Sequence, residues 1–107
     1  MSGFDLDRAG ERLSDKIFAS RTDEKHVDER ELVTRALFNA LERQDLVLAD
    51  EKPSDVLCVS LYVHDNMVGC TITVARLSMS LERTHEAHRT IIALLHRSYK
   101  WISVVFT

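Results

Sequence analysis

The sequence predicts a single α+β domain over residues 1–107, with two N-terminal helices, an antiparallel β-hairpin, a packing helix and a third, C-terminal strand. Two observations carry this prediction. Apolar residues recur at helical spacing in the first half, and two strand-forming segments separated by two turn residues follow in the second. A chain of 107 residues can bury one hydrophobic core, and three glycines with one proline exclude a disordered or collagen-like chain.

The first predicted helix spans residues 4–19, where apolar side chains fall on one stripe and charged ones on the other. Ser2 and Asp5 are candidate caps for its start. The stripe consists of Leu6, Ala9, Leu13 and Ile17.

A second helix is predicted to begin after Asp28, an N-cap residue that Glu31 would complete as a capping box. Val27 would add a hydrophobic staple, and the apolar stripe ends near Arg43. A longer helix starting at Thr22 is the alternative. With either start, the N-terminal part of the chain is predicted to form a helical hairpin.

The strongest signal is a β-hairpin formed by residues 56–63 and 67–75, after a loop marked by Pro53. Asp65 and Asn66 tolerate the left-handed conformation that a two-residue turn requires. That turn gives a register with one wholly apolar face, which pairs Val63 with Val68, Leu61 with Cys70, Val59 with Ile72 and Leu57 with Val74. A register shifted by two residues, with a four-residue loop, is the alternative that keeps the same two faces.

The same register places Cys58 and Cys70 on opposite faces, so we expect two free thiols, with Cys70 the more buried. It also places Tyr62 over Gly69, as an aromatic cover for a strand glycine. A change of alternation near Arg76 predicts a bulge.

A third helix is predicted over residues 81–99, with His88 at the edge of its apolar face. Residues 101–107 suit either a continuation of this helix or a strand. The strand is favoured because a lone hairpin is marginally stable in water.

Charge is distributed unevenly. Residues 1–55 carry fourteen Asp and Glu against nine Lys and Arg, residues 56–107 carry three against five, and the net charge is −3. An acidic protein is a poor general binder of nucleic acid. The basic residues of the second half, which lie on or near the third helix, remain the candidate nucleic-acid contacts: Arg83, Arg89, Arg97 and Lys100.

No run approaches the roughly 20 apolar residues of a membrane span, and residues 1–13 lack the features of a secretory signal. A soluble cytoplasmic protein without membrane association is therefore expected. The sequence predicts no metal, cofactor or catalytic set. His85 and His88 are three residues apart rather than the four of the zinc-protease helix, and no base is identified for Cys58.

The second face of the hairpin is the main functional candidate, because it carries no full charge. Either the protein's own third helix or another molecule must cover it. Its candidate contact residues are Cys58, Ser60, Tyr62, Thr71 and Thr73.

Three functions are compatible with these features. The favoured one is a small non-enzymatic protein that self-associates, with a dimer preferred, and binds a protein partner through the uncharged sheet face. The second is a small-molecule-binding protein or enzyme with a cleft between sheet and helices, using His64 and His88 as polar groups. The third is a nucleic-acid-binding regulator.

Overall fold

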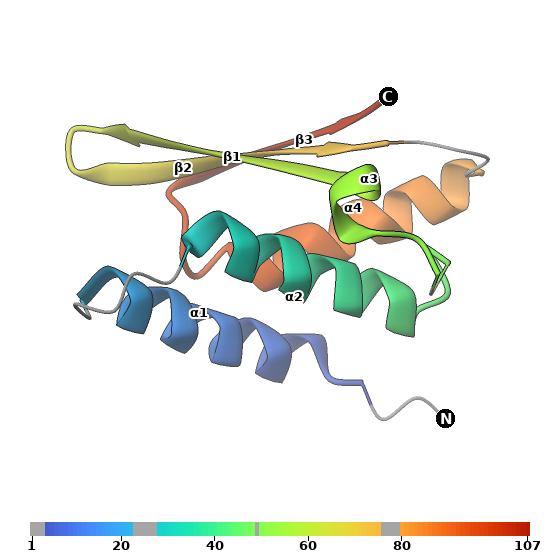
Figure 1. The fold of residues 1–107 in the computed structure, drawn as a ribbon, viewed down its shortest axis with the longest axis horizontal. Helices are drawn as coiled ribbons and strands as arrows, with labels where there is room; N and C mark the ends of the chain where they lie inside the picture. Colours follow the sequence, from blue (N-terminus) through green and yellow to red (C-terminus); the bar gives the residue numbers. More distant parts are fainter. Residues whose placement is uncertain (1–3, 23–27, 49, 76–79) are drawn as a thin grey trace.

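The computed structural model describes residues 4–22, 28–48, 50–75 and 80–107. The predicted α+β architecture is confirmed, and its elements lie in the predicted order (Figure 1). They are α1 (Leu6–Thr22), α2 (Glu29–Arg43), the single-turn α3 (Pro53–Val56), β1 (Leu57–His64), β2 (Met67–Val74), α4 (Leu81–Leu95) and β3 (Trp101–Phe106). None of the described helices is long and apolar enough to cross a lipid bilayer.

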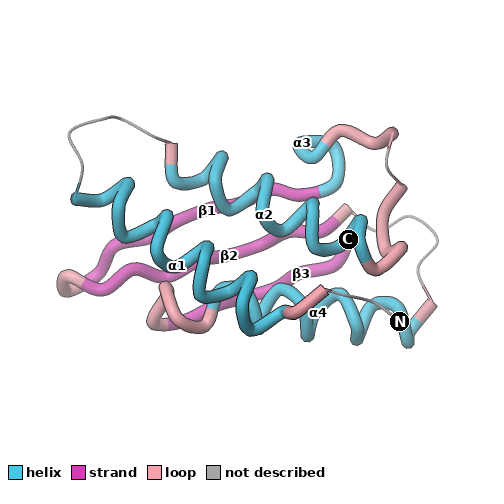
Figure 2. Tube along the Cα trace, turned by 90° about the horizontal axis from the view of Figure 1, so that it is seen from below, coloured by secondary structure: helices cyan, strands magenta, loops and turns pink. Residues whose placement is uncertain are grey.

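The elements form three layers, with the sheet on one side, α2 and α4 packed against it, and α1 beneath them (Figure 1). Viewed from below, α1 runs across α2 and α4, with the sheet behind all three (Figure 2). The alternative in which the third predicted helix covers the second sheet face is therefore wrong. All three long helices lie on the same side, and no described segment covers the other face.

The hairpin register is confirmed pair by pair, from Leu57 opposite Val74 to His64 opposite Met67. Asp65 and Asn66 have φ values of 51° and 63°, so both adopt the left-handed conformation of a two-residue turn. This matters for function, because the register decides which side chains face the helices and which face away.

Residues 101–106 form a strand rather than a continuation of the helix. β3 pairs with β2 in parallel, and the strand order is β1-β2-β3. The parallel direction follows from the connection, since α4 carries the chain back along the sheet before β3 begins. Both β1 and β3 are edge strands.

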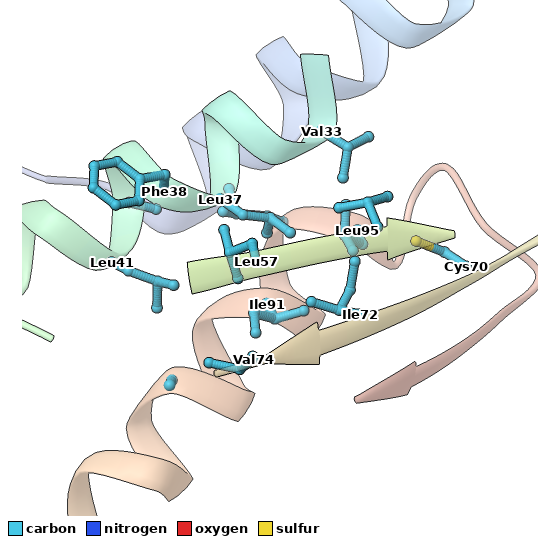
Figure 3. Close-up of a cluster of buried hydrophobic side chains, with 14 of the residues drawn as sticks. Val33, Leu37, Phe38, Leu41, Leu57, Cys70, Ile72, Val74, Ile91 and Leu95 are labelled. Carbon is cyan, nitrogen blue, oxygen red and sulfur yellow. The ribbon is translucent and has the colours of Figure 1, made fainter. Parts of the chain in front are cut away.

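The core lies between the sheet and the α2/α4 layer (Figure 3). Leu37 and Leu41 of α2 and Ile91 and Leu95 of α4 lie with Ile72 of the central strand in one cluster between helices and sheet, and all five are fully buried. The sheet and these two helices are therefore held as one packed unit.

Local signals set the helix starts. Asp5 caps α1 by accepting hydrogen bonds from the backbone N–H groups of residues 7 and 8 at 3.1 and 3.3 Å, and Asp28 caps α2 by accepting from the N–H of residue 30. Glu31 does not behave as a capping-box residue; its carboxylate pairs with Arg35 at 2.8 Å. Pro53 begins α3 rather than a loop, a position that suits its missing N–H.

Two predictions lie outside the described residues: the hydrophobic staple at Val27 and the bulge near Arg76.

The buried face of α4 differs from the predicted one. Ala87 and Thr90 are buried, whereas His88 is exposed and Leu81 is 75% exposed. Thr90 lies where α4 meets the end of α2, a contact between segments far apart in the sequence that helical spacing does not show. The hydroxyl of Thr90 accepts a hydrogen bond from Gln44 Nε2 at 2.8 Å, which ties α4 to the end of α2.

Candidate functional site

The side of the sheet that faces away from the helices is named the outer face. Its central positions are half-exposed hydroxyl residues, and the larger apolar side chains Tyr62, Met67, Trp101 and Val105 are 39–49% exposed. No Asp, Glu, Lys or Arg lies among them. The outward-pointing residues are Cys58, Ser60, Tyr62 and His64 on β1, Met67, Gly69, Thr71 and Thr73 on β2, and Trp101, Ser103 and Val105 on β3.

The structure thus brings the five predicted contact residues Cys58, Ser60, Tyr62, Thr71 and Thr73 onto one surface. Sequence reasoning missed the contribution of β3. The alternation of residues 101–106 was a usable signal, because Ile102, Val104 and Phe106 pack against the core and the intervening residues must then face outward. Their position beside β2, however, depends on tertiary pairing.

Trp101, not Tyr62, covers the strand glycine. An ideal Cβ on Gly69 would lie 2.1 Å from the indole ring of Trp101, so the ring occupies the space that any larger residue at 69 would need. Tyr62 is the antiparallel partner of Gly69, as predicted, but the ring nearest the glycine belongs to Trp101, its parallel partner on β3. The indole lies over Gly69 and enlarges the apolar part of the outer face.

The two cysteines are free, Cys58 exposed on the outer face and Cys70 buried beneath the sheet. Burial, reinforced by the negative charge of Glu29, raises the pKa of the Cys70 thiol to about 12. Cys70 is therefore an unreactive core residue. Only Cys58 offers a thiol to an approaching molecule.

The predicted polar groups of a sheet–helix cleft do not come together. His64 lies at the hairpin turn, where its Nε2 is 3.3 Å from Asp65 Oδ2 and both side chains are largely exposed. His88 is exposed on α4. Between sheet and helices the space is filled by the core, and a cavity of about 430 Å³ lies elsewhere, between α1 and α2.

The four candidate nucleic-acid contacts are also divided. Arg83 donates to the backbone oxygen of Asp45 at one end of α4, whereas Arg97, beyond the other end, lies 3.8 Å from the carboxylate of Glu11. Arg89 and Lys100 are exposed. Two of the four are thus directed at the protein's own chain, and the set does not form one basic surface.

A half-buried polar cluster joins the end of α1 and the start of α2 to Tyr99, which precedes β3. Arg21 makes two hydrogen bonds of 2.7 and 2.8 Å to the carboxylate of Glu29, which also accepts one of 2.6 Å from the Tyr99 hydroxyl. Burial alone would raise the pKa of Glu29, but the hydrogen bonds from Arg21 and Tyr99 outweigh it and hold that pKa below its ordinary value. Burial and the bond to Glu29 raise the pKa of Tyr99. The role of this cluster is therefore structural: its hydrogen bonds hold Arg21, Glu29 and Tyr99 together.

Within residues 4–22, 28–48, 50–75 and 80–107, no group of three or more His, Cys, Asp or Glu side chains is arranged to hold a metal ion. No protein-family model matches the chain, and searches of curated proteins and of solved structures likewise find no match. The geometry of the outer face is thus the basis for a functional assignment.

Proposed function

We propose that this chain is a small non-enzymatic protein that self-associates by packing the outer face of one copy against the outer face of a second. The observation that carries the proposal is the uncharged outer face, which has four half-exposed large apolar side chains and no covering segment among the described residues. A sheet face open to water normally carries charged residues, and contiguous exposed apolar surface marks an interaction site.

The absence of charge on the outer face makes a second copy of the chain a suitable occupant. Each copy has a net charge of −3, so two copies repel one another wherever their acidic surfaces meet. The outer face lets two identical chains approach without this repulsion. A twofold arrangement also needs a self-complementary surface, and a face of hydroxyl, aromatic and aliphatic groups can pack on a copy of itself without burying an unpaired charge.

We further propose that the protein works in the cytoplasm. Cys58 and Cys70 are unpaired, and Cys58 is exposed. An exposed free thiol persists in a reducing compartment and is oxidised readily in a secretory one. The dimer would then act as a binding module that presents two copies of any partner site on its helical side.

The test compares two lysine substitutions at neighbouring positions of β1. Tyr62 points outward and is 49% exposed, whereas Val63 points to the helix side yet is 74% exposed beyond the helices. Tyr62→Lys places a charge in the proposed interface, and Val63→Lys places the same charge on the same strand outside it.

Sedimentation velocity over a range of concentrations measures the outcome. We expect the wild type and Val63→Lys to dimerise and Tyr62→Lys to remain monomeric, with all three giving the same circular dichroism spectrum. A wild type that is monomeric at the highest attainable concentration contradicts the proposal. So does a dimer that Tyr62→Lys leaves intact.

A further inference from the structure

A groove lies between α1 and α2, two helices that lie on the side of the sheet opposite the outer face (Figure 2). At one end the two helices are tied together by the Arg21–Glu29 ion pair. Towards the other end α1 lies against α4 instead. A Cβ on Gly10 would be 2.8 Å from the backbone oxygen of Ala93, so only glycine permits this approach. At this end α1 is closer to α4 than to α2, so the space between α1 and α2 is open. It forms a cavity of about 430 Å³, whose lining includes Leu94 of α4.

Basic side chains line both rims of the groove. On α1 they recur every four residues, and on α2 the two arginines are eight residues apart, so each set faces the groove from one side of its helix. One acidic residue, Asp5, lies among the lining residues, although the first half of the chain is acidic as a whole. The basic lining residues are Arg8, Arg12 and Lys16 on α1 and Arg35 and Arg43 on α2.

Most of this positive charge is not neutralised within the described part of the chain. Arg35 pairs with Glu31, and Arg43 lies over the ring of Phe4 at 5.4 Å. The side chains of Arg8, Arg12 and Lys16 make no ion pair with any described carboxylate, and all three are exposed. The neighbouring acidic residue Glu11 faces away towards α4, where it meets Arg97.

The floor between the basic rims is apolar. It is made of short and medium aliphatic side chains, which leave room for a partner to approach both helix backbones. The floor residues are Ala9 and Leu13 of α1, Leu32, Ala36 and Ala40 of α2, and Leu94 of α4. The lining residues extend over about three turns of each helix, or about 18 Å at 1.5 Å per residue.

We propose that this groove binds an acidic amphipathic helix of a protein partner. Its floor offers apolar contact along a line, and its rims offer cations at successive turns of α1 and at two positions of α2. A single-headed amphiphile would meet only one or two of these cations, and a nucleic-acid backbone would leave the apolar floor unused. A helix with an apolar stripe flanked by Glu or Asp satisfies both features, as in other helix-in-groove complexes. The proposal does not depend on self-association, because the groove and the outer face are on opposite sides.

The test uses a defined probe and the full chain. The probe is an end-capped helical peptide of about 16 residues, long enough to cover the groove, with Leu and Ala on one face and Glu on both flanks. Its matched control has Gln in place of every Glu. Titration into ¹⁵N-labelled protein is followed by two-dimensional NMR. We expect the acidic peptide to shift amides of α1 and α2 around the groove, to bind more weakly as salt is raised, and to bind far better than the Gln peptide.

Two protein variants with the same change in net charge locate the site. Arg12→Glu reverses a charge on the groove rim, whereas Arg89→Glu reverses an exposed charge on α4 outside the groove. Arg12→Glu is expected to weaken binding of the acidic peptide by about ten-fold or more, and Arg89→Glu to leave it within about two-fold. The proposal is overturned if the acidic peptide fails to bind at millimolar concentration, binds both variants equally, or shifts residues elsewhere. It is also overturned if oligothymidylate or phosphatidylglycerol vesicles bind at the groove and the peptide does not.

Discussion

The indole of Trp101 lies on Gly69, its partner across the parallel β2–β3 pair, and fills the space that a side chain at residue 69 would occupy. This contact fixes the orientation of the largest side chain on the outer face. It also links the C-terminal strand to the centre of the sheet by side-chain packing as well as by backbone hydrogen bonds. Because Trp101 is the only tryptophan of the chain, its fluorescence reports on this contact directly.

Gly69→Ala is expected to displace the indole from the sheet. Alanine ordinarily suits a strand better than glycine, but here its Cβ would overlap the ring, and overpacking of this kind costs about 1–3 kcal/mol. We expect a red-shifted tryptophan emission, greater quenching by acrylamide and a lower free energy of unfolding in urea. In a Trp101→Ala background the same Gly69→Ala change should be neutral or stabilising, since the clash is absent. An unchanged emission spectrum in Gly69→Ala would show that the ring does not rest there.

The hairpin turn gives a stabilising prediction. Asp65 and Asn66 both have positive φ, and glycine has the least strain at the second position of such a turn. Asn66→Gly is therefore expected to raise the free energy of unfolding by a few tenths of a kcal/mol, up to about 1 kcal/mol. Asn66→Val, which forces a β-branched residue into the same conformation, should lower it by about 1–2 kcal/mol. Urea denaturation measures the free energy of unfolding of both variants and the wild type, with Asn66→Gly expected to be the most stable and Asn66→Val the least. Equal stabilities would contradict the turn geometry.

The Arg21–Glu29–Tyr99 cluster predicts a pH dependence. The folded pKa of Glu29 lies below its ordinary value of 4.5, so its contribution to stability is present above that value. The contribution is lost as pH falls through the folded pKa. Glu29→Gln should therefore cost about 1–2 kcal/mol at pH 7, a difference that shrinks as the solution is acidified below about pH 4.5.

Glu31→Gln is the matched control for that prediction. The Glu31–Arg35 pair has a similar distance of 2.8 Å, but its side chains are 64% and 71% exposed. Exposed pairs of this kind contribute about 0.5 kcal/mol or less, so Glu31→Gln should be nearly neutral at both pH values. If the two variants lose the same stability at pH 7, the cluster at Glu29 does not have the assigned role.

The thiols should differ sharply in reactivity. Cys70 is fully buried and its pKa is raised to about 12, whereas Cys58 is exposed. In native protein at pH 8, iodoacetamide is expected to modify Cys58 and leave Cys70 intact until urea unfolds the chain. Peptide mass spectrometry after alkylation distinguishes the two sites. Modification of native Cys70, or a disulfide between the two cysteines, would contradict the hairpin register.

Much of the sheet could be predicted from the sequence because its determinants are local. Two turn residues fix the hairpin register, and strict alternation then assigns every side chain from Leu57 to Val74 to a face. The same logic placed Cys58 and Cys70 on opposite faces. The caps at Asp5 and Asp28 are also local, since each involves a side chain and backbone N–H groups two or three residues away.

The features that could not be predicted from the sequence depend on contacts between segments that are far apart along the chain. Hydrophobic spacing alone placed His88 at the core boundary, because it does not show which side of α4 the rest of the fold covers, and the fold buries Ala87 and Thr90 instead. The basic residues Arg8, Arg12 and Lys16 of α1 recur every four positions in the sequence, but nothing local shows that they flank one groove with Arg35 and Arg43 of α2. Likewise, the position of Trp101 over Gly69 requires the parallel pairing of β3.

The central claim, that a second copy covers the outer face, is tested most directly by the rate at which iodoacetamide modifies Cys58 as protein concentration is raised. Cys58 is the one cysteine on that face, so its accessibility reports whether the face is covered. We predict that the rate per molecule falls with concentration in the wild type and stays constant in Tyr62→Lys. A wild-type rate that does not change with concentration would mean that the outer face remains open to solvent, and self-association through it would be contradicted.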